Sequence, residues 1–497
     1  MARSGPRHTA RRSTEPSLPL TWQQHDLLLD SLEHRGTGRH VEQLSWRWRG
    51  PLDTERFTAA WQSVVDRETV LRAAFAWEPE PHVVLHERAE VEVARHPAGS
   101  LDWEELLECD RLRGFDLRNP GPLRITLLDL PDEPGRLPAR PAATRVLLTF
   151  HHGLLDAWSV FVLLDEFYRA YLAGGELPGG ERRPDVRDWV LWLDSQDLAP
   201  AREFWTRTVP AGAPAVLPAV PGPATRERGS GRVEAQLTRT EAERLHCWAA
   251  AQAVPDSTAL QAVWALLLYR GARAGGPAQV GFGVTVSGRG IALEAVERLP
   301  GPMRNCLPMS VQVAPEHRLS QLLTALRDRA LDMAAYEWVS TGQIHEWTGR
   351  ATGGGRLLES MVAVESMPHR PEELCTELAA DGIRVDPPRA SGAQPALPVA
   401  LLAHRGPDGG LILIAVHDRA RLSRAEASRL LGQCVRLLRE LPGTDQETTV
   451  AQVLAVLAGD DPPRIAARHR SAAQHTARTR LHSIGGRATV DPVTSGS

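Results

Sequence analysis

The chain has 497 residues, enough for two or three domains with large hydrophobic cores. Its 42% apolar and 24% charged residues are typical of a soluble globular protein, and a formal net charge of −4 gives no basic surface for nucleic acid. All 57 basic residues are arginine, so no lysine is available as a catalytic base or Schiff-base former. The chain has no run of eighteen apolar residues, so we expect no membrane-spanning helix.

The N-terminus and the cysteines indicate a cytoplasmic protein. Met1–Glu15 is basic and polar with no apolar run behind it, so it is not a signal peptide, and residues 1–16 are expected to be disordered. The five cysteines are scattered and show no C-x-x-C spacing, which predicts reduced thiols and no zinc site. They are Cys109, Cys247, Cys306, Cys375 and Cys434.

The first part of the chain predicts alternating helices and strands. Leu18–Leu32 is typical of an apolar lead-in followed by a helix, and Val41–Trp48 alternates like a strand. Apolar residues within Phe57–Val65 form one face of a second helix. Residues 131–143 are rich in Pro, Arg and Gly and predict a surface loop, and Gly174–Pro184 predicts a linker.

Two histidines and an aspartate follow a predicted strand in the middle of this region. Arg145–Phe150 is apolar and β-branched like a buried strand, and Val160–Leu172 has the apolar spacing of a helix. Between them lie His151, His152 and Asp156. Successive side chains of an extended segment point to opposite faces, so one histidine should be structural and the other free for chemistry. A neutral imidazole can accept a proton near pH 7, although an isolated His-His pair is equally typical of ordinary loop or core histidines.

The second half continues the mixed α/β pattern. Residues 210–231 predict an exposed loop, and residues from about 458 onward predict a disordered, Arg-rich tail. The clearest predicted elements are a helix at Ala259–Tyr269, a strand at Val280–Val286, a helix at Leu319–Tyr336, a strand at Leu411–Val416 and a helix at Leu422–Leu438.

Several of these segments together resemble the condensation domains of nonribosomal peptide synthetases. Thr149–Ser159 is similar to the His-His-x-x-x-Asp-Gly signature of that family, with Ala157 where the family normally has Gly. Val65–Phe75 resembles the second family motif, with Glu68 where a His is usual, and we take this segment as scaffold. The resemblance extends in order over roughly residues 17–456.

The resemblance implies an α/β (α+β) fold of two subdomains, each like chloramphenicol acetyltransferase, arranged in a V with the active site in a tunnel between them. The N-terminal subdomain, with the His-His motif, would span residues 17–180 and the C-terminal subdomain residues 181–457. The disordered tail would then cover residues 458–497.

The resemblance also implies roles for the motif residues. His152 would face the tunnel as the base, or as the group that orients the nucleophile, and His151 would be buried against the scaffold. Asp156 would complete the catalytic motif as a structural carboxylate paired with an arginine of the other subdomain. Arg289 is the best candidate for that arginine, and a solvated loop charge is the alternative.

Three further residues are candidates for substrate binding. Trp158 and Ser159 follow the motif and would shape the floor of the tunnel. Asn305 lies in Leu299–Met309, which is similar to the family segment "GxFxNTLPxR". Asn305 could line the tunnel or could equally cap a loop. No metal ligand is assigned.

The implied activity is condensation of two substrates carried by other proteins. A donor thioester on the phosphopantetheine of a carrier protein would be attacked by an amine or alcohol acceptor, itself a small molecule or carrier-bound. We find no adenylation motif and no carrier serine, so we expect a free-standing, monomeric enzyme that meets acyl or peptidyl carrier proteins in trans, with no cofactor of its own and no nucleic-acid or membrane partner. The alternatives are an impaired condensation-like domain that recruits a partner protein, and an acyl-CoA-dependent acyltransferase, although the Asp-Phe-Gly-Trp-Gly segment of the plant enzymes is missing.

Overall fold

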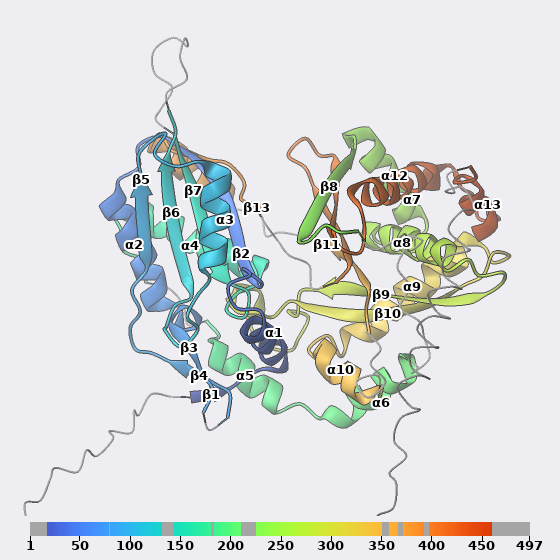
Figure 1. Ribbon diagram of the computed structural model, residues 1–497, viewed down its shortest axis with the longest axis horizontal. Coiled ribbons are helices and arrows are strands. Elements are labelled where there is room, and N and C mark those ends of the chain that lie inside the picture. The colour runs from blue at the N-terminus through green and yellow to red at the C-terminus, as the bar shows by residue number, and fades with distance from the viewer. Residues whose placement is uncertain are drawn as a thin grey trace, which may run out of the picture.

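A computed structural model describes residues 17–78, 80–131, 143–179, 183–209, 225–349, 357–365, 371–391 and 397–459. Figure 1 shows two lobes side by side, each with a sheet and covering helices, the first mainly blue to cyan and the second green to red. Both lobes mix helices and strands, so the predicted α/β class is confirmed. The predicted disordered termini lie outside the described residues, apart from residues 458 and 459, and so does most of the loops predicted at 131–143 and 210–231.

The first lobe is built on a sheet whose centre is β7 (Ala143–His151). This strand pairs antiparallel with β2 (Val41–Arg49) on one side and with β6 (Leu123–Asp129) on the other, and β5 (Glu92–His96) runs parallel to β6. Most of β7 is buried, as its apolar sequence predicts. The strand ends at His151, so the histidine motif begins where the strand pairing stops.

Helices cover this sheet, and their aromatic side chains form much of the core. Phe57 and Trp61 of one helix lie 4.7 and 4.8 Å, centroid to centroid, from Phe167 of another. Burial of each such side chain stabilises the fold by roughly 1.5–3 kcal/mol. The helices are α1 (Trp22–Glu33), α2 (Thr54–Arg67), α3 (Trp103–Arg113), α4 (Ala157–Leu172), α5 (Val186–Asp194) and the short η1 (Thr69–Arg72); a small sheet joins β1 (Ser17–Pro19), β4 (His82–Leu85) and β3 (Ala73–Ala76).

The second lobe has a six-stranded mixed sheet in the order β10-β9-β11-β14-β15-β8. Only β11 runs parallel to both of its neighbours. The strands are β8 (Ser230–Leu237), β9 (Ala278–Val286), β10 (Asn305–Val313), β11 (Ser360–Val364), β14 (Val399–Arg405) and β15 (Leu411–Asp418). The helices are α6 (Leu198–Thr208), α7 (Arg239–Ala251), α8 (Asp256–Ala272), α9 (Leu319–Ala334), α10 (Thr341–Trp347), α12 (Arg424–Glu440) and α13 (Val450–Ala455), with the short η4 (Leu441–Gly443).

The first lobe also takes in segments from the second half of the chain. Residues 296–303, which include the short helix η2 (Val296–Arg298), and α11 (Glu372–Ala380) place apolar side chains in its core. The short strands β12 (Arg384–Val385) and β13 (Arg389–Ser391) pair with β2. The hydrophobic cores are therefore not divided at residue 180, where the sequence predicts the subdomain boundary.

The helices and strands that were predicted from hydrophobic periodicity or from an apolar run are confirmed. Long regular segments have the most reliable sequence signal, and their ends differ from the predicted ends by only a few residues. These elements are α1, β2, α2, β7, α4, α8, β9, α9, β15 and α12. No helix within the described ranges has both the length and the apolar character needed to cross a bilayer.

Candidate active site

The motif residues occupy a tight connection between β7 and α4. His151 is the last residue of β7, and Asp156 is the N-cap of α4, where its carboxylate accepts the Ser159 backbone N–H at 2.8 Å. An aspartate is a favoured N-cap because its side chain replaces a missing helical acceptor. The sequence therefore fixes both ends of the connection and holds His152 between them.

His151 is buried, and its hydrogen bonds fix its tautomer. The Gly153 N–H donates to Nδ1 at 3.1 Å, so Nδ1 is the acceptor and Nε2 carries the proton. Nε2 lies 3.0 Å from the Ser31 hydroxyl, which donates to the Leu27 carbonyl at 2.7 Å. Burial, with smaller effects from the charges of neighbouring histidines, lowers the pKa of His151 to about 3. His151 is thus neutral near pH 7 and both of its nitrogens are used by the protein.

His152 has the opposite arrangement. Its Nδ1 lies 3.2 Å from the Leu155 carbonyl, which can only accept, so in the neutral ring the proton is on Nδ1 and the lone pair on Nε2. Its backbone N–H donates to the His40 carbonyl at 2.8 Å, and the ring is only partly buried. The two histidines therefore differ as the alternation of side chains predicts: one is enclosed, and one presents a basic nitrogen.

Asp156 joins the two lobes through a buried ion pair with Arg289. Their side chains are 1% and 4% exposed, and Arg289 donates to the carboxylate at 2.8 and 3.2 Å. The backbone N–H groups of Met303 and Arg304 donate to the same carboxylate at 3.1 and 2.9 Å. Burial raises the pKa of Asp156, but the Arg289 charge and the hydrogen bonds from Arg289 and Ser159 outweigh it and hold that pKa below its usual value.

The remaining predicted site residues are held by the protein. The Ser159 hydroxyl is fully buried and bonds Asp156 at 2.7 Å, and the Asn305 amide donates to the carbonyls of Glu337 and Val339 at 2.9 and 2.5 Å. The polar atoms of Ser159 and Asn305 are thus bonded to groups of the protein itself, and substrate binding by either residue stays a prediction.

Trp158 is partly exposed and lies at the junction between the lobes. Its indole N–H donates to the Glu297 carbonyl at 2.7 Å, and the Arg289 guanidinium lies 5.6 Å from its ring centroid. The cation is within the range at which a tryptophan face attracts it. Trp158 is therefore placed beside the Asp156–Arg289 pair, with part of its surface free.

The alanine at the usual glycine position has no conformational cost. Ala157 is the first residue of α4, and it is not among the residues with positive φ. Alanine is the best helix former, and only a left-handed backbone would require glycine here. The departure from the family motif therefore leaves the loop geometry undisturbed.

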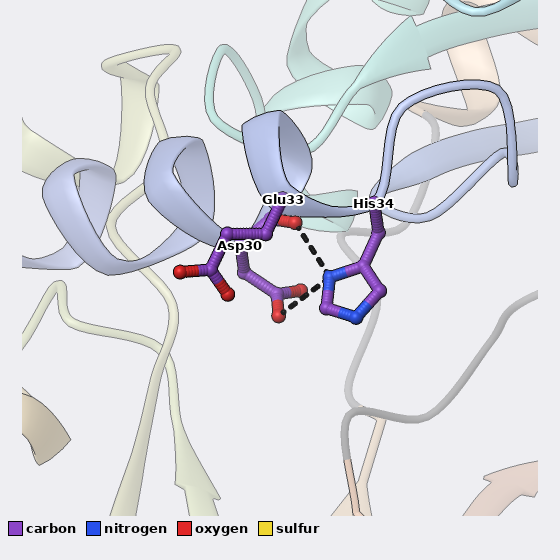
Figure 2. A group of neighbouring side chains, drawn as sticks. All are labelled: Asp30, Glu33 and His34. Carbon is purple, nitrogen blue, oxygen red and sulfur yellow. Dashed lines mark hydrogen bonds and ion pairs between the residues drawn. The ribbon is translucent and has the colours of Figure 1, made fainter.

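Sequence reasoning missed a group of residues at the end of α1, beside the motif. Asp30 binds Arg39 Nε at 2.7 Å and His40 Nε2 at 2.6 Å, and His40 packs against the motif. Figure 2 shows His34 turned back toward Asp30, with its Nδ1 2.9 Å from the Asp30 carbonyl. No motif marks these residues, and only the fold brings them to His152.

Asp30, Glu33 and His34 bring three potential metal ligands within 4.8 Å of one another. The donor atoms of two of them are already engaged, since Asp30 is ion-paired with Arg39 and the two nitrogens of His34 face Asp30 and Arg39. The group is therefore better described as a network of ion pairs and hydrogen bonds than as a metal centre.

Two chloramphenicol-acetyltransferase-like lobes joined at a His-His-x-x-x-Asp motif define a class of acyltransferase-like folds. Comparison with known proteins narrows the class to a family. The condensation domain family matches residues 15–441, and the chain belongs to this family.

The curated relatives are much longer than this chain. The chain is 30% identical over 446 residues to one of the linear gramicidin synthase proteins of Brevibacillus parabrevis, covering 86% of this chain and 6% of that protein. It is 30% identical over 346 residues to the chondramide synthase cmdD of Chondromyces crocatus, covering 67% of this chain and 8% of that protein. The chain thus corresponds to a small part of each relative.

Solved structures show the same fold at lower identity. The first condensation domain of the CDA synthetase matches with a TM-score of 0.68 at 21% identity, covering 88% of this chain and 98% of that one. The condensation domain of the Monacolin K polyketide synthase MokA matches with a TM-score of 0.71 at 14% identity, covering 88% and 99%. The predicted two-subdomain fold is therefore confirmed.

Proposed function

We propose that the protein forms an amide or ester bond between a thioester donor and a nucleophilic acceptor, with His152 as the base. The observation that carries this proposal is the opposite tautomers of His151 and His152. The Leu155 carbonyl holds the His152 proton on Nδ1 and leaves Nε2 as an acceptor. The family membership supports condensation as the reaction class.

The reaction follows from this arrangement in balanced steps. The acceptor amine or alcohol gives its proton to His152 Nε2 as its nitrogen or oxygen attacks the thioester carbonyl. The tetrahedral intermediate then collapses, the carbon–sulfur bond breaks, and the proton on Nε2 passes to the departing thiolate. A base placed in this way is worth roughly 10²–10⁴-fold in rate. No acyl-enzyme is needed, because the step is a direct transfer.

Asp156 and Arg289 act through structure in this proposal. Their ion pair and the backbone donors of residues 303 and 304 fix α4 against the segment that connects β9 to β10. The connection that carries His152 is anchored at its C-terminal end by that pair. Two substrates held in line between the lobes would gain from this rigidity, since orientation lowers the barrier of a bimolecular reaction.

We propose that the donor is carried on the phosphopantetheine of a carrier protein, with no cofactor resident in the chain. The matched relatives are named as a linear gramicidin synthase and a chondramide synthase, and the chain belongs to the condensation domain family, which supports a carrier-bound donor. One structural neighbour favours a second donor. The starter condensation domain of rhizomide synthetase was solved with C8-CoA, and its TM-score to this chain is 0.68 at 16% identity.

A second candidate function is recruitment of a partner protein without catalysis. The X-domain from teicoplanin biosynthesis, solved in complex with OxyB, matches with a TM-score of 0.67 at 21% identity. The intact motif and the helical position of Ala157 favour catalysis in this chain.

The central test is His152→Ala, assayed for product from a loaded carrier protein and a set of amine and alcohol acceptors. We expect turnover to fall about 10²–10⁴-fold with folding retained, because the base is lost and the backbone contact is kept. His151→Ala is the matched comparison, and it should lower stability because it opens a buried cavity. An unchanged rate in His152→Ala would remove His152 from the mechanism.

The donor is tested by offering one acyl group on a carrier protein, on coenzyme A and on a short thiol. We expect the carrier-bound thioester to react fastest, because docking of the carrier raises the effective concentration of its arm. Equal or faster reaction with coenzyme A would favour the acyl-CoA-dependent reaction. Intact mass measurement during turnover should show no acyl adduct on the protein.

A further inference from the structure

One helix, α1, holds the histidine motif in place. Gln24 donates from Nε2 to the Gly153 carbonyl at 3.2 Å, and Ser31 bonds His151 Nε2 at 3.0 Å. Positions 24 and 31 are seven residues apart, so they lie on the same face of the helix. The residues on both sides of His152 are therefore fixed by α1.

The same helix reaches His152 itself through His40. Asp30, in the last turn of α1, binds His40 Nε2 at 2.6 Å, and the side chain of His40 is only 9% exposed. The His40 ring meets the His151 ring edge to face, with centroids 6.4 Å apart. Burial lowers the pKa of His40 below its ordinary value, so His40 is neutral near pH 7 and donates its Nε2 proton to the Asp30 carboxylate.

The backbone of His40 is in an unusual conformation where it meets the motif. Its φ is 60°, in the left-handed region that residues with a Cβ rarely adopt. In this conformation its carbonyl accepts the His152 backbone N–H at 2.8 Å, next to the first paired residues of the sheet, Val41 and His151. A disfavoured backbone persists only where surrounding contacts hold it, and here the bond to Asp30 provides such a contact.

We propose that His40, clamped by Asp30, is a positioning residue for His152. The bond to Asp30 stabilises the left-handed backbone of His40. In that conformation the His40 carbonyl points at the His152 N–H and so fixes the backbone from which the His152 ring projects. His40 does not touch the reacting atoms, and its action on catalysis rests on the proposed function of His152. The effect of His40 on the geometry of His152 does not depend on that proposed function.

The test compares substitutions at position 40 that differ in their tolerance of a left-handed backbone. Asparagine adopts this conformation readily, whereas a β-branched valine does not. We expect His40→Val to lower kcat about 10–100-fold, since a base misplaced by about an ångström can cost that much, with the KM for the carrier-bound donor unchanged. His40→Asn should recover most of the lost kcat, and Asp30→Asn should fall between the two.

The matched control is Glu33→Gln, because His34 itself contacts the Asp30 carboxylate, with Nδ1 3.4 Å from Oδ1. Glu33 lies in the same turn of α1, and its side chain is exposed. We expect the kcat of this variant to equal that of the wild type. A wild-type kcat in His40→Val, or equal losses in His40→Val and His40→Asn, would overturn the proposal.

A second measurement separates this inference from the proposed function. The ring nitrogen NMR signals of His152, assigned with His152→Gln, report its tautomer without any assay of activity. We expect the wild type to show the proton on Nδ1 and His40→Val to show altered His152 signals, with the His151 tautomer unchanged. If His152→Ala proves as active as the wild type, the proposed function fails, and these signals still decide whether His40 positions the ring. Unaltered His152 signals in both His40→Val and Asp30→Asn would contradict the inference. If the valine variant does not fold, the His152 signals of Asp30→Asn and His40→Asn are compared instead.

Discussion

Two buried clusters, each built around one arginine, shift the pKa of a carboxyl group in opposite directions. In the interlobe cluster, Arg289 pairs with one carboxylate, Asp156. In the first lobe, Arg183 binds two carboxylates, Glu68 at the end of α2 and Glu166 of α4. All five side chains are at most 12% exposed.

The number of carboxylates for each guanidinium decides the difference. Asp156 has its own arginine and several N–H and O–H donors, which keep it ionised in spite of burial. At Glu68, burial and the charge of Glu166 outweigh the shared Arg183 and raise the pKa to about 8. Burial and the neighbouring Glu166 carboxylate therefore favour the protonated form of Glu68 near pH 7. Burial alone does not set the charge of a carboxylate; the count of compensating partners does.

The largest expected effect comes from breaking the interlobe cluster. Asp156→Ala leaves Arg289 as an uncompensated buried charge, which costs about 3–5 kcal/mol of unfolding free energy. Urea or thermal unfolding measures this loss. Asp156→Asn is the control that keeps the shape of the side chain and removes its charge. Wild-type stability of Asp156→Ala with loss of turnover would make Asp156 a directly catalytic group.

The cluster of the first lobe should respond to pH instead. The folded-state pKa of Glu68, about 8, is above its unfolded value, so its contribution to stability is fully present below the unfolded value and is lost as pH rises toward 8. We expect the unfolding free energy to fall with pH in this window, by at most about 1.4 kcal/mol per pH unit for one proton. Glu68→Gln should remove this slope, so that the variant matches the wild type at acidic pH and is the more stable of the two near pH 7, because a glutamine takes up no proton on folding. Denaturation at several pH values measures it, and the same slope in Glu68→Gln would show that Glu68 is ionised.

The smallest expected effect is at the residue beside Asp156. Ala157→Gly restores the usual residue of the family motif, but position 157 is helical and needs no glycine. We expect a loss of about 0.5–1 kcal/mol in unfolding free energy and no gain in turnover. Denaturant titration and the carrier-based assay measure these two quantities. A large gain in turnover would mean that the glycine has a role at the active site that the helix does not explain.

Much of the fold and part of the candidate site follow from local patterns. The strand before His151 and the helix after Asp156 are evident from apolar spacing, and alternation along a strand separates His151 from His152. The bonding partners of Ser159 and Asn305 could not be predicted, because the sequence around a polar residue does not show which distant group it will meet. Their donors and acceptors are used by groups up to 142 residues away in the chain.

The sequence by itself determined the elements, the family resemblance and the order of the motif, because short-range periodicity and turn chemistry are written in neighbouring residues. Only the tertiary structure decided that α1 and His40 hold the motif, that stretches beyond residue 180 complete the first core, and which nitrogen of each motif histidine carries the proton. These outcomes depend on contacts between segments far apart in the chain. No local pattern encodes such contacts, since burial, charge balance and hydrogen-bond pairing exist only once those segments meet.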